Sequence, residues 1–142
     1  MIAAAAGVRD RLVQIVCLDT LEYLHRGGRI GNATRFIGGL LDIKPLVEIN
    51  HRTGLVEFCG QARTRRKSIE TLISRFLEKF SPEKPKRVAV LHGNALPEAL
   101  ALADRIKREY NPSELLVNIT GPVLGIHTGP RALALCGYAE EG

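Results

Sequence analysis

Three short stretches of this 142-residue chain hold the residues best suited to chemistry. The first is Arg26–Asn32 (RGGRIGN), in which glycines permit tight turns and close backbone approach and two arginines add positive charge. It lacks the Gly-Lys-Ser/Thr ending of a Walker loop and the spacing of a dinucleotide-binding turn. The stretch therefore predicts either an anion held on backbone amides or a plain turn between two helices, with its arginines solvated.

The second stretch, Arg63–Lys67 (RTRRK), places four cations at the start of an expected helix. Helix N-termini favour acidic groups, so each misplaced cation costs about 0.3–1 kcal/mol at low salt. A nearby anion or an acidic partner surface would offset that cost, and a phosphate backbone would also fit these cations. The alternative is a solvated charge run that salt screens.

The third stretch, Gly121–Pro130 (GPVLGIHTGP), sets a histidine and a threonine between two glycine–proline pairs. We expect residues 121–131 to form a stiff loop. His127 can donate a hydrogen bond or titrate near neutral pH, and the Thr128 hydroxyl can donate to a carboxylate. The plainer alternative is a structural or exposed histidine. With no zinc-protease motif and no metal set, local sequence indicates three anion-handling loops and no reaction.

The elements that position these stretches follow from the apolar pattern. Strands and helices alternate except at one hairpin, which predicts an α/β (α+β) fold: a two-layer mixed sheet with helices packed on it, on one face. Asp19 and Asn32 are the expected N-caps of the first two helices. The expected strands are 12–18, 46–49, 55–59, 88–91, 115–119 and 132–138, and a short helix is the alternative for the last of them. The expected helices are 19–26, 32–41, 64–80 and 97–110.

Composition limits the class of protein. With 45% hydrophobic and 25% charged residues the chain is globular, and no apolar run reaches the length of a membrane span. A net charge of +5 admits nucleic acid, anionic lipid or an acidic ligand, but 5% aromatic residues disfavour stacking on single-stranded nucleic acid. Cys17, Cys59 and Cys136 match no metal spacing and favour a reducing cytoplasm. We expect no metal and no cofactor.

Four blocks in order resemble the DegV family of bacterial fatty-acid-binding proteins. They are Leu18–Gly31 (LDTLEYLHRGGRIG), Leu41–Pro45 (LDIKP), Arg63–Lys67 and Gly125–Pro130 (GIHTGP). One block alone would be weak evidence, but four with matching order and spacing are not expected by chance. The resemblance covers about residues 9–142.

The resemblance implies a two-lobed carrier with a fatty acid enclosed between and within its lobes. The bound carboxylate is presented to a separate fatty acid kinase, which makes acyl phosphate from ATP, so the carrier itself is not an enzyme. This chain resembles the C-terminal lobe, with its mixed sheet and helices. We therefore expect residues 9–142 to be that lobe, residues 1–8 to be a residual segment, and the N-terminal lobe to be absent.

The same resemblance implies residue roles. His127 and Thr128 would lie beside the carboxylate, Arg63 near the head group and the kinase-docking face, and Arg29 on the rim. Arg131 stands where many relatives have glycine, so it would narrow the mouth of the site or add charge. The expected acyl-chain lining, for which ordinary core is the alternative, is Phe36, Ile37, Leu40 and Leu41.

The leading hypothesis is thus a cytoplasmic protein that helps to enclose a long-chain fatty acid, without membrane insertion. Its partners would be the fatty acid, a fatty acid kinase and the N-terminal lobe. The alternative is a basic nucleic-acid-binding or regulatory module that rests on Arg63–Lys67. An enzyme that uses His127 as a base is disfavoured, because the sequence offers no group to orient the imidazole.

Overall fold

A six-stranded mixed sheet runs through the molecule in the order β3-β2-β1-β6-β4-β5. The computed structural model describes residues 1–38, 43–80, 85 and 87–139. β4 and β5 pair in parallel, and the remaining neighbours pair antiparallel. The strands are β1 (Val13–Cys17), β2 (Lys44–Asn50), β3 (Leu55–Ala62), β4 (Arg87–His92), β5 (Glu114–Ile119) and β6 (Leu133–Tyr138). All six expected strands and the mixed sheet are confirmed.

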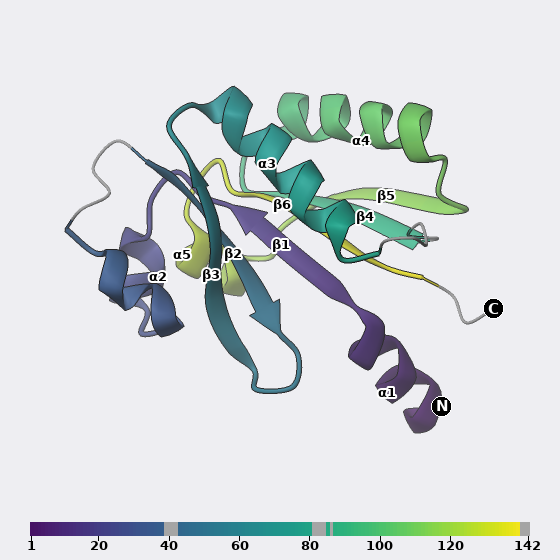
Figure 1. The fold of residues 1–142 in the computed structure, drawn as a ribbon, viewed down its shortest axis with the longest axis horizontal. Helices are drawn as coiled ribbons and strands as arrows, with labels where there is room; N and C mark the ends of the chain where they lie inside the picture. The colour runs from purple at the N-terminus through teal and green to yellow at the C-terminus, as the bar shows by residue number, and fades with distance from the viewer. Residues whose placement is uncertain (39–42, 81–84, 86, 140–142) are drawn as a thin grey trace.

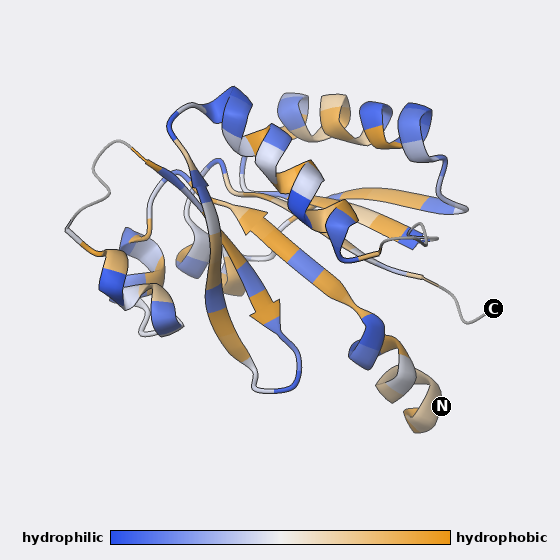
Figure 2. Ribbon diagram, in the orientation of Figure 1, coloured by the Kyte–Doolittle hydropathy of each residue, from blue (hydrophilic) through white to orange (hydrophobic). Residues whose placement is uncertain are grey.

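Two long helices, α3 (Arg65–Glu78) and α4 (Leu96–Tyr110), lie on the same face of the sheet (Figure 1). The α3 residues Leu72, Ile73 and Phe76 are buried in the main core, together with Ile15 and Leu135 of the sheet. In Figure 2 hydrophobic and hydrophilic residues alternate along both helices, whereas β1 is largely hydrophobic. This amphipathic pattern is what a helix packed on a sheet requires.

A second, smaller core lies on the other face of β2 and β3. Here α2 (Glu22–Arg26) and the 3-10 helix η1 (Gly31–Phe36) pack their apolar residues against Val47. Because Leu46 belongs to the main core and its neighbour Val47 to this one, the two clusters lie on opposite sides of the sheet. The sheet therefore carries short helices on the face that α3 and α4 leave uncovered, so the expectation that the helices pack on one face is wrong for α2 and η1.

Asp19 and Asn32, the two expected N-caps, do not cap a helix with their side chains. The Asp19 side chain lies among cations, and the backbone N–H of Glu22 bonds instead to Thr20 Oγ1, at 3.1 Å. The Asn32 Oδ1 accepts the Phe58 backbone N–H at 2.8 Å and so ties η1 to β3. The helix expected over 32–41 is a 3-10 helix that ends at Phe36, and residues 39–42 lie outside the described part.

The loop expected over 121–131 is also a wrong prediction. Residues 122–128 form a helix, α5 (Pro122–Thr128), with proline in its first turn and the left-handed Gly129 directly after it. Proline pre-sets the backbone of a first helical turn, and glycine readily follows a last one. The glycine–proline pairs thus delimit a helix.

A further helix, α1 (Ile2–Arg11), precedes β1 and projects from the body of the fold (Figure 1). The Arg11 Nη1 donates a hydrogen bond to the Ala139 carbonyl at 2.9 Å, which ties the end of α1 to the segment after β6. No helix in the described ranges is both long and apolar enough to cross a bilayer.

Candidate functional site

The candidate site lies at one edge of the sheet, where β1, β3, β4 and β5 all have their carboxyl ends. β1 and β4 both run antiparallel to β6, β5 is parallel to β4, and β3 and β1 both run antiparallel to β2. The three stretches singled out from the sequence follow these ends: Arg26–Asn32 after β1, Arg63–Lys67 after β3 and Gly121–Pro130 after β5. Ligand sites of open sheets commonly lie outside such ends.

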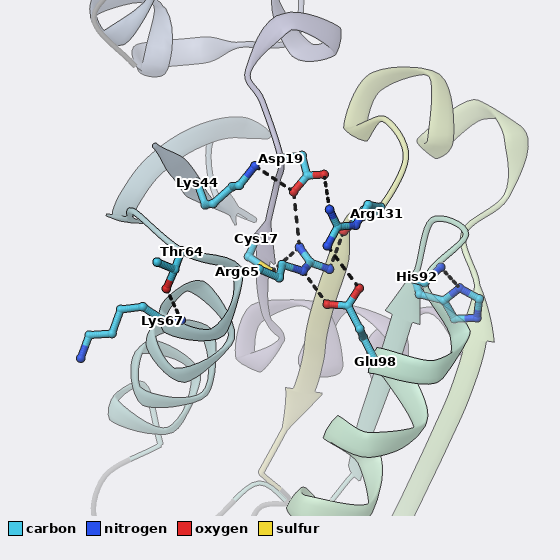
Figure 3. A network of polar contacts seen from close by, with 10 residues as sticks. Cys17, Asp19, Lys44, Thr64, Arg65, Lys67, His92, Glu98 and Arg131 are labelled. Carbon is cyan, nitrogen blue, oxygen red and sulfur yellow. Dashed lines mark hydrogen bonds and ion pairs between the residues drawn. The ribbon is translucent and has the colours of Figure 1, made fainter. Parts of the chain in front are cut away.

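Five charged residues meet at this edge, and we call them the Asp19 cluster (Figure 3). Its members, each from a different segment of the chain, are Asp19, Lys44, Arg65, Glu98 and Arg131. The Arg65 Nε donates to Glu98 Oε2 at 2.6 Å, and Arg65 Nη2 donates to the Arg131 carbonyl at 2.7 Å. Asp19 lies 3.4 Å from both Lys44 Nζ and Arg131 Nη1. Three cations against two carboxylates leave the cluster positive.

Arg65 is the least exposed cation of the cluster, with 15% of its side chain accessible. Burial opposes its charge, but the hydrogen bond to Glu98 and the nearby carboxylates outweigh burial and raise the pKa of Arg65. Its Nη1 also contacts the Cys17 sulfur at 3.7 Å. Burial nevertheless raises the pKa of the Cys17 thiol, which favours its protonated form.

The run of cations at the start of α3 is divided between two roles. Thr64 caps the helix by accepting the Lys67 backbone N–H at 3.2 Å, and Arg65 turns inward to the carboxylates. Arg63 and Arg66 remain exposed at the surface. The protein's own carboxylates, Asp19 and Glu98, thus neutralise one of the four cations at this helix start.

Sequence reasoning chose Arg63 and missed Arg65, although a signal was present. Stepping backward along the apolar stripe of α3 from Leu72 through Ile69 leads, one turn earlier, to Arg65. Arg65 is therefore the cation that the helix periodicity directs toward the sheet.

His127 lies in the last turn of α5, at the same edge. Its Nδ1 is buried next to Gly27, without a hydrogen-bond partner among the described residues. The residue as a whole is partly exposed, and Nε2 is not among the buried unpartnered atoms. Thr128 is buried, and its hydroxyl donates to the Leu124 carbonyl at 3.1 Å within its own helix. The Thr128 hydroxyl is therefore already used within α5, whereas the described residues leave His127 Nδ1 without a partner.

The sequence analysis also singled out Arg29 and Arg131. Arg29 is exposed just after α2, where its backbone N–H bonds to the Leu24 carbonyl at 2.9 Å. Arg131 adopts a left-handed backbone, with φ +63°, and its guanidinium reaches Asp19 and Glu98. A left-handed backbone is the conformation that glycine adopts most readily, and here an arginine holds it while completing the ion cluster.

An apolar cleft of about 270 Å³ opens beside the Asp19 cluster. Phe36 and Ile37 line it together with Ile43 and Pro45, and Asp19 stands at its wall. The Phe36 ring stacks on Phe58 with 3.9 Å between centroids. Two of the four expected lining residues therefore border a cleft. The other two, Leu40 and Leu41, lie outside the described residues.

The described residues hold no group of three or more His, Cys, Asp or Glu arranged to bind a metal ion. His92, at the end of β4, is buried and its Nδ1 accepts the Ala95 backbone N–H at 3.2 Å, so it supports the start of α4. The three cysteines are free thiols.

Cys59 gives a first testable prediction. Burial, followed by the negative charge of Glu48, raises the pKa of this thiol to about 12. At pH 8 about one thiol in 10⁴ would be ionised, against roughly a quarter for a free cysteine, so iodoacetamide should modify Cys59 about 10³-fold more slowly. Peptide mass spectrometry over a time course, with and without urea, measures this. Equal rates in the folded and unfolded chain would contradict it.

The fold and this edge define a class of protein: a mixed α+β fold with a cluster of charged residues at the carboxyl edge of its sheet, a partly exposed histidine (His127) and an adjoining apolar cleft. The chain belongs to the DegV family, because the family model described as "Uncharacterised protein, DegV family" matches residues 1–140. The resemblance read from the four sequence blocks is confirmed.

Individual relatives agree. A DegV domain-containing protein from Clostridium acetobutylicum is 37% identical over 123 residues, which are 87% of this chain and 42% of the relative. A Thermus thermophilus DegV family structure, described by its fatty acid binding, has a TM-score of 0.84 at 31% identity, over 98% of this chain and 49% of that one. A Streptococcus pneumoniae fatty acid kinase B3 protein loaded with linoleic acid shares the fold, with a TM-score of 0.83 at 16% identity over 98% of this chain and 48% of that one. The chain spans about half the length of these relatives.

Proposed function

We propose that residues 9–142 are the C-terminal lobe of a DegV-type carrier and help to enclose a long-chain fatty acid, with His127 beside the carboxylate. The observation that carries this proposal is the likeness to the Thermus thermophilus protein, 31% identical across 98% of this chain and described as fatty-acid-binding. The half-length coverage supports a second, N-terminal lobe as the partner of this one.

The chemistry of the carboxyl edge supports the same proposal. A fatty acid carries one carboxylate at neutral pH, and a partly buried carboxylate needs donors or cations. His127 would offer Nε2, and Arg63 is exposed directly after β3, at the same edge, while Arg29 is exposed after α2. Arg65 and Arg131 already contact the protein's own carboxylates, so we assign them to holding the edge in place.

The acyl chain would begin in the apolar cleft that Phe36 and Ile37 line. Each buried CH₂ of such a chain contributes about 0.8 kcal/mol. The remaining enclosure, including further carboxylate donors, would come from the N-terminal lobe. This lobe alone should accordingly bind fatty acid far more weakly than the two-lobed protein.

In this proposal the lobe is a cytoplasmic binding protein without a cofactor, and a separate fatty acid kinase phosphorylates the presented carboxylate. The name of the pneumococcal relative supports a kinase partner. His127 also lacks, among the described residues, the acceptor on Nδ1 that orients a catalytic histidine. Its arrangement favours binding over general-base catalysis.

The test uses full-length protein, solvent extraction and mass spectrometry. We expect about one fatty acid per molecule, and none would refute the proposal. His127→Ala should weaken binding roughly 10- to 100-fold, because a hydrogen bond to a charged group contributes about 1.5–3 kcal/mol. His51→Ala, in the hairpin at the opposite edge of the sheet, is the matched control and should bind normally.

The exposed cations Arg63, Arg66 and Lys67 keep a basic nucleic-acid-binding or regulatory module as the second candidate. Arg65, the fourth cation of that run, is already paired with carboxylates, which reduces the footprint offered to phosphates. DNA affinity that falls steeply with salt would support this candidate. No binding at low salt would end it.

A further inference from the structure

Position 27 has no room for a side chain larger than that of glycine. Its backbone angles, φ −81° and ψ −3°, are ordinary helical values that any residue adopts. A Cβ at this position, however, would lie 2.6 Å from the His127 Cε1 and closer still to Nδ1. Real Cβ atoms do not approach other atoms so closely, so the imidazole occupies the room that a side chain at position 27 would need.

A second contact of the same kind lies beside the first. Gly129 has φ +76°, and a Cβ there would lie 2.7 Å from Cε2 of Tyr23 and closer still to Cδ2. Tyr23 and Gly27 are four residues apart and share one face of α2 and its end. In the contact between α2 and α5, the α2 side thus contributes Tyr23 and Gly27, and the α5 side contributes His127 and Gly129.

The first contact determines what surrounds each nitrogen of His127. Nδ1 is buried with no hydrogen-bond partner, and the Cα hydrogen of Gly27 that takes the Cβ position points toward it. A lone pair on Nδ1 attracts the weakly positive Cα hydrogen of Gly27. A hydrogen on Nδ1 would instead point at that Cα hydrogen, and the two positive hydrogens would repel each other. A neutral imidazole carries its one hydrogen on either nitrogen, so this environment favours the hydrogen on Nε2.

We propose that Gly27 is a positioning residue that holds His127 as the neutral Nε2–H tautomer, with its donor directed out of the slot between α2 and α5. Tyr23 over Gly129 keeps that slot closed. The role of this donor in binding rests on the proposed function. There, the slot gives the fatty acid carboxylate a fixed donor that needs no rearrangement on binding. The tautomer itself does not depend on which ligand is bound.

The wild-type protein provides the first test. Side-chain ¹⁵N NMR of lipid-free, full-length protein above neutral pH distinguishes a protonated from an unprotonated ring nitrogen. We expect His127 to show one tautomer, hydrogen on Nε2, while the exposed His25 shows the usual mixture. A His127 signal that matches the mixture, or hydrogen on Nδ1, would overturn the proposal.

The variant Gly27→Ala provides the second test, with Gly125→Ala as its control. The methyl at position 27 should displace the imidazole, shift the His127 signals toward the mixture and weaken fatty acid binding about tenfold. A Cβ on Gly125, in α5 itself, meets nothing nearer than 4.0 Å, so this variant should keep wild-type tautomer and affinity.

The outcomes separate the two proposals. If wild-type protein binds no fatty acid but His127 shows the single tautomer, the proposed function fails and the positioning role stands. If wild-type protein binds and Gly27→Ala keeps both affinity and tautomer, the positioning role fails alone. If Gly27→Ala does not fold, the wild-type spectrum still decides the tautomer.

Discussion

Gly31→Ala is expected to lower the free energy of unfolding by about 2–5 kcal/mol, the sum of a left-handed backbone penalty and an overpacking penalty. Gly31 has φ +57°, and a Cβ there would lie 3.0 Å from the Val56 carbonyl carbon and closer still to its oxygen. That neighbour is strand backbone and cannot rotate aside. η1 would have to lift from β3, which would also separate Phe36 from Phe58 beneath the cleft.

Gly28→Ala isolates the contact with Val56. Gly28 has the same kind of backbone, φ +69°, but a Cβ there meets nothing within 4 Å. Gly28→Ala should therefore lower the free energy of unfolding only by the left-handed backbone penalty, about 1–2 kcal/mol. Urea unfolding of both variants and the wild type measures the difference. Equal losses of stability in the two variants would mean that the close approach of η1 to β3 does not restrict the side chain at position 31.

Phe76→Ala should cost about 3–5 kcal/mol, as large-to-small changes in a packed core do. Phe76 is fully buried at the centre of the main core, edge-on to Phe80 with 5.0 Å between ring centroids. Total stabilities of small domains are about 5–15 kcal/mol, so this one change would remove a large part. Thermal and urea unfolding of the full-length protein measure it.

Phe36→Ala is the control that separates core from site. Phe36 is half-buried at the cleft and stacked on Phe58. We expect a smaller loss of stability than for Phe76→Ala but a clearer loss of fatty acid binding. If Phe36→Ala weakened only stability, the cleft would not hold the acyl chain.

The sheet and the long helices could be predicted because their signals are local and repeated. In α3 the apolar residues recur at helical spacing over four turns, and Ser81-Pro82 marks the end of the pattern. The buried strands have no such period, but their length and apolar content were sufficient. Position 27 shows the limit: its ordinary backbone angles give no sequence reason for a glycine, and the reason lies in His127, far along the chain.

The wrong predictions arise where distant residues decide a local structure. Asp19 followed by Glu22 has the form of a capping box, but Lys44, Arg65 and Arg131 draw the Asp19 carboxylate away from the helix start. No local pattern reports those partners. In Gly121–Pro130, glycine and proline mark boundaries equally well for a loop and for a short helix, and only the packing of α5 against α2 decides between them.

The position of β6 has a consequence for biosynthesis. This strand comes last of the six in sequence, yet it lies between β1 and β4 and hydrogen-bonds to both. While the chain leaves the ribosome, the β1–β3 ribbon and the β4–β5 pair have no shared strand until Leu133–Tyr138 emerges. The two halves of the sheet can therefore pair through β6 only once this strand has been made, and until then each half exposes a strand edge that could pair wrongly.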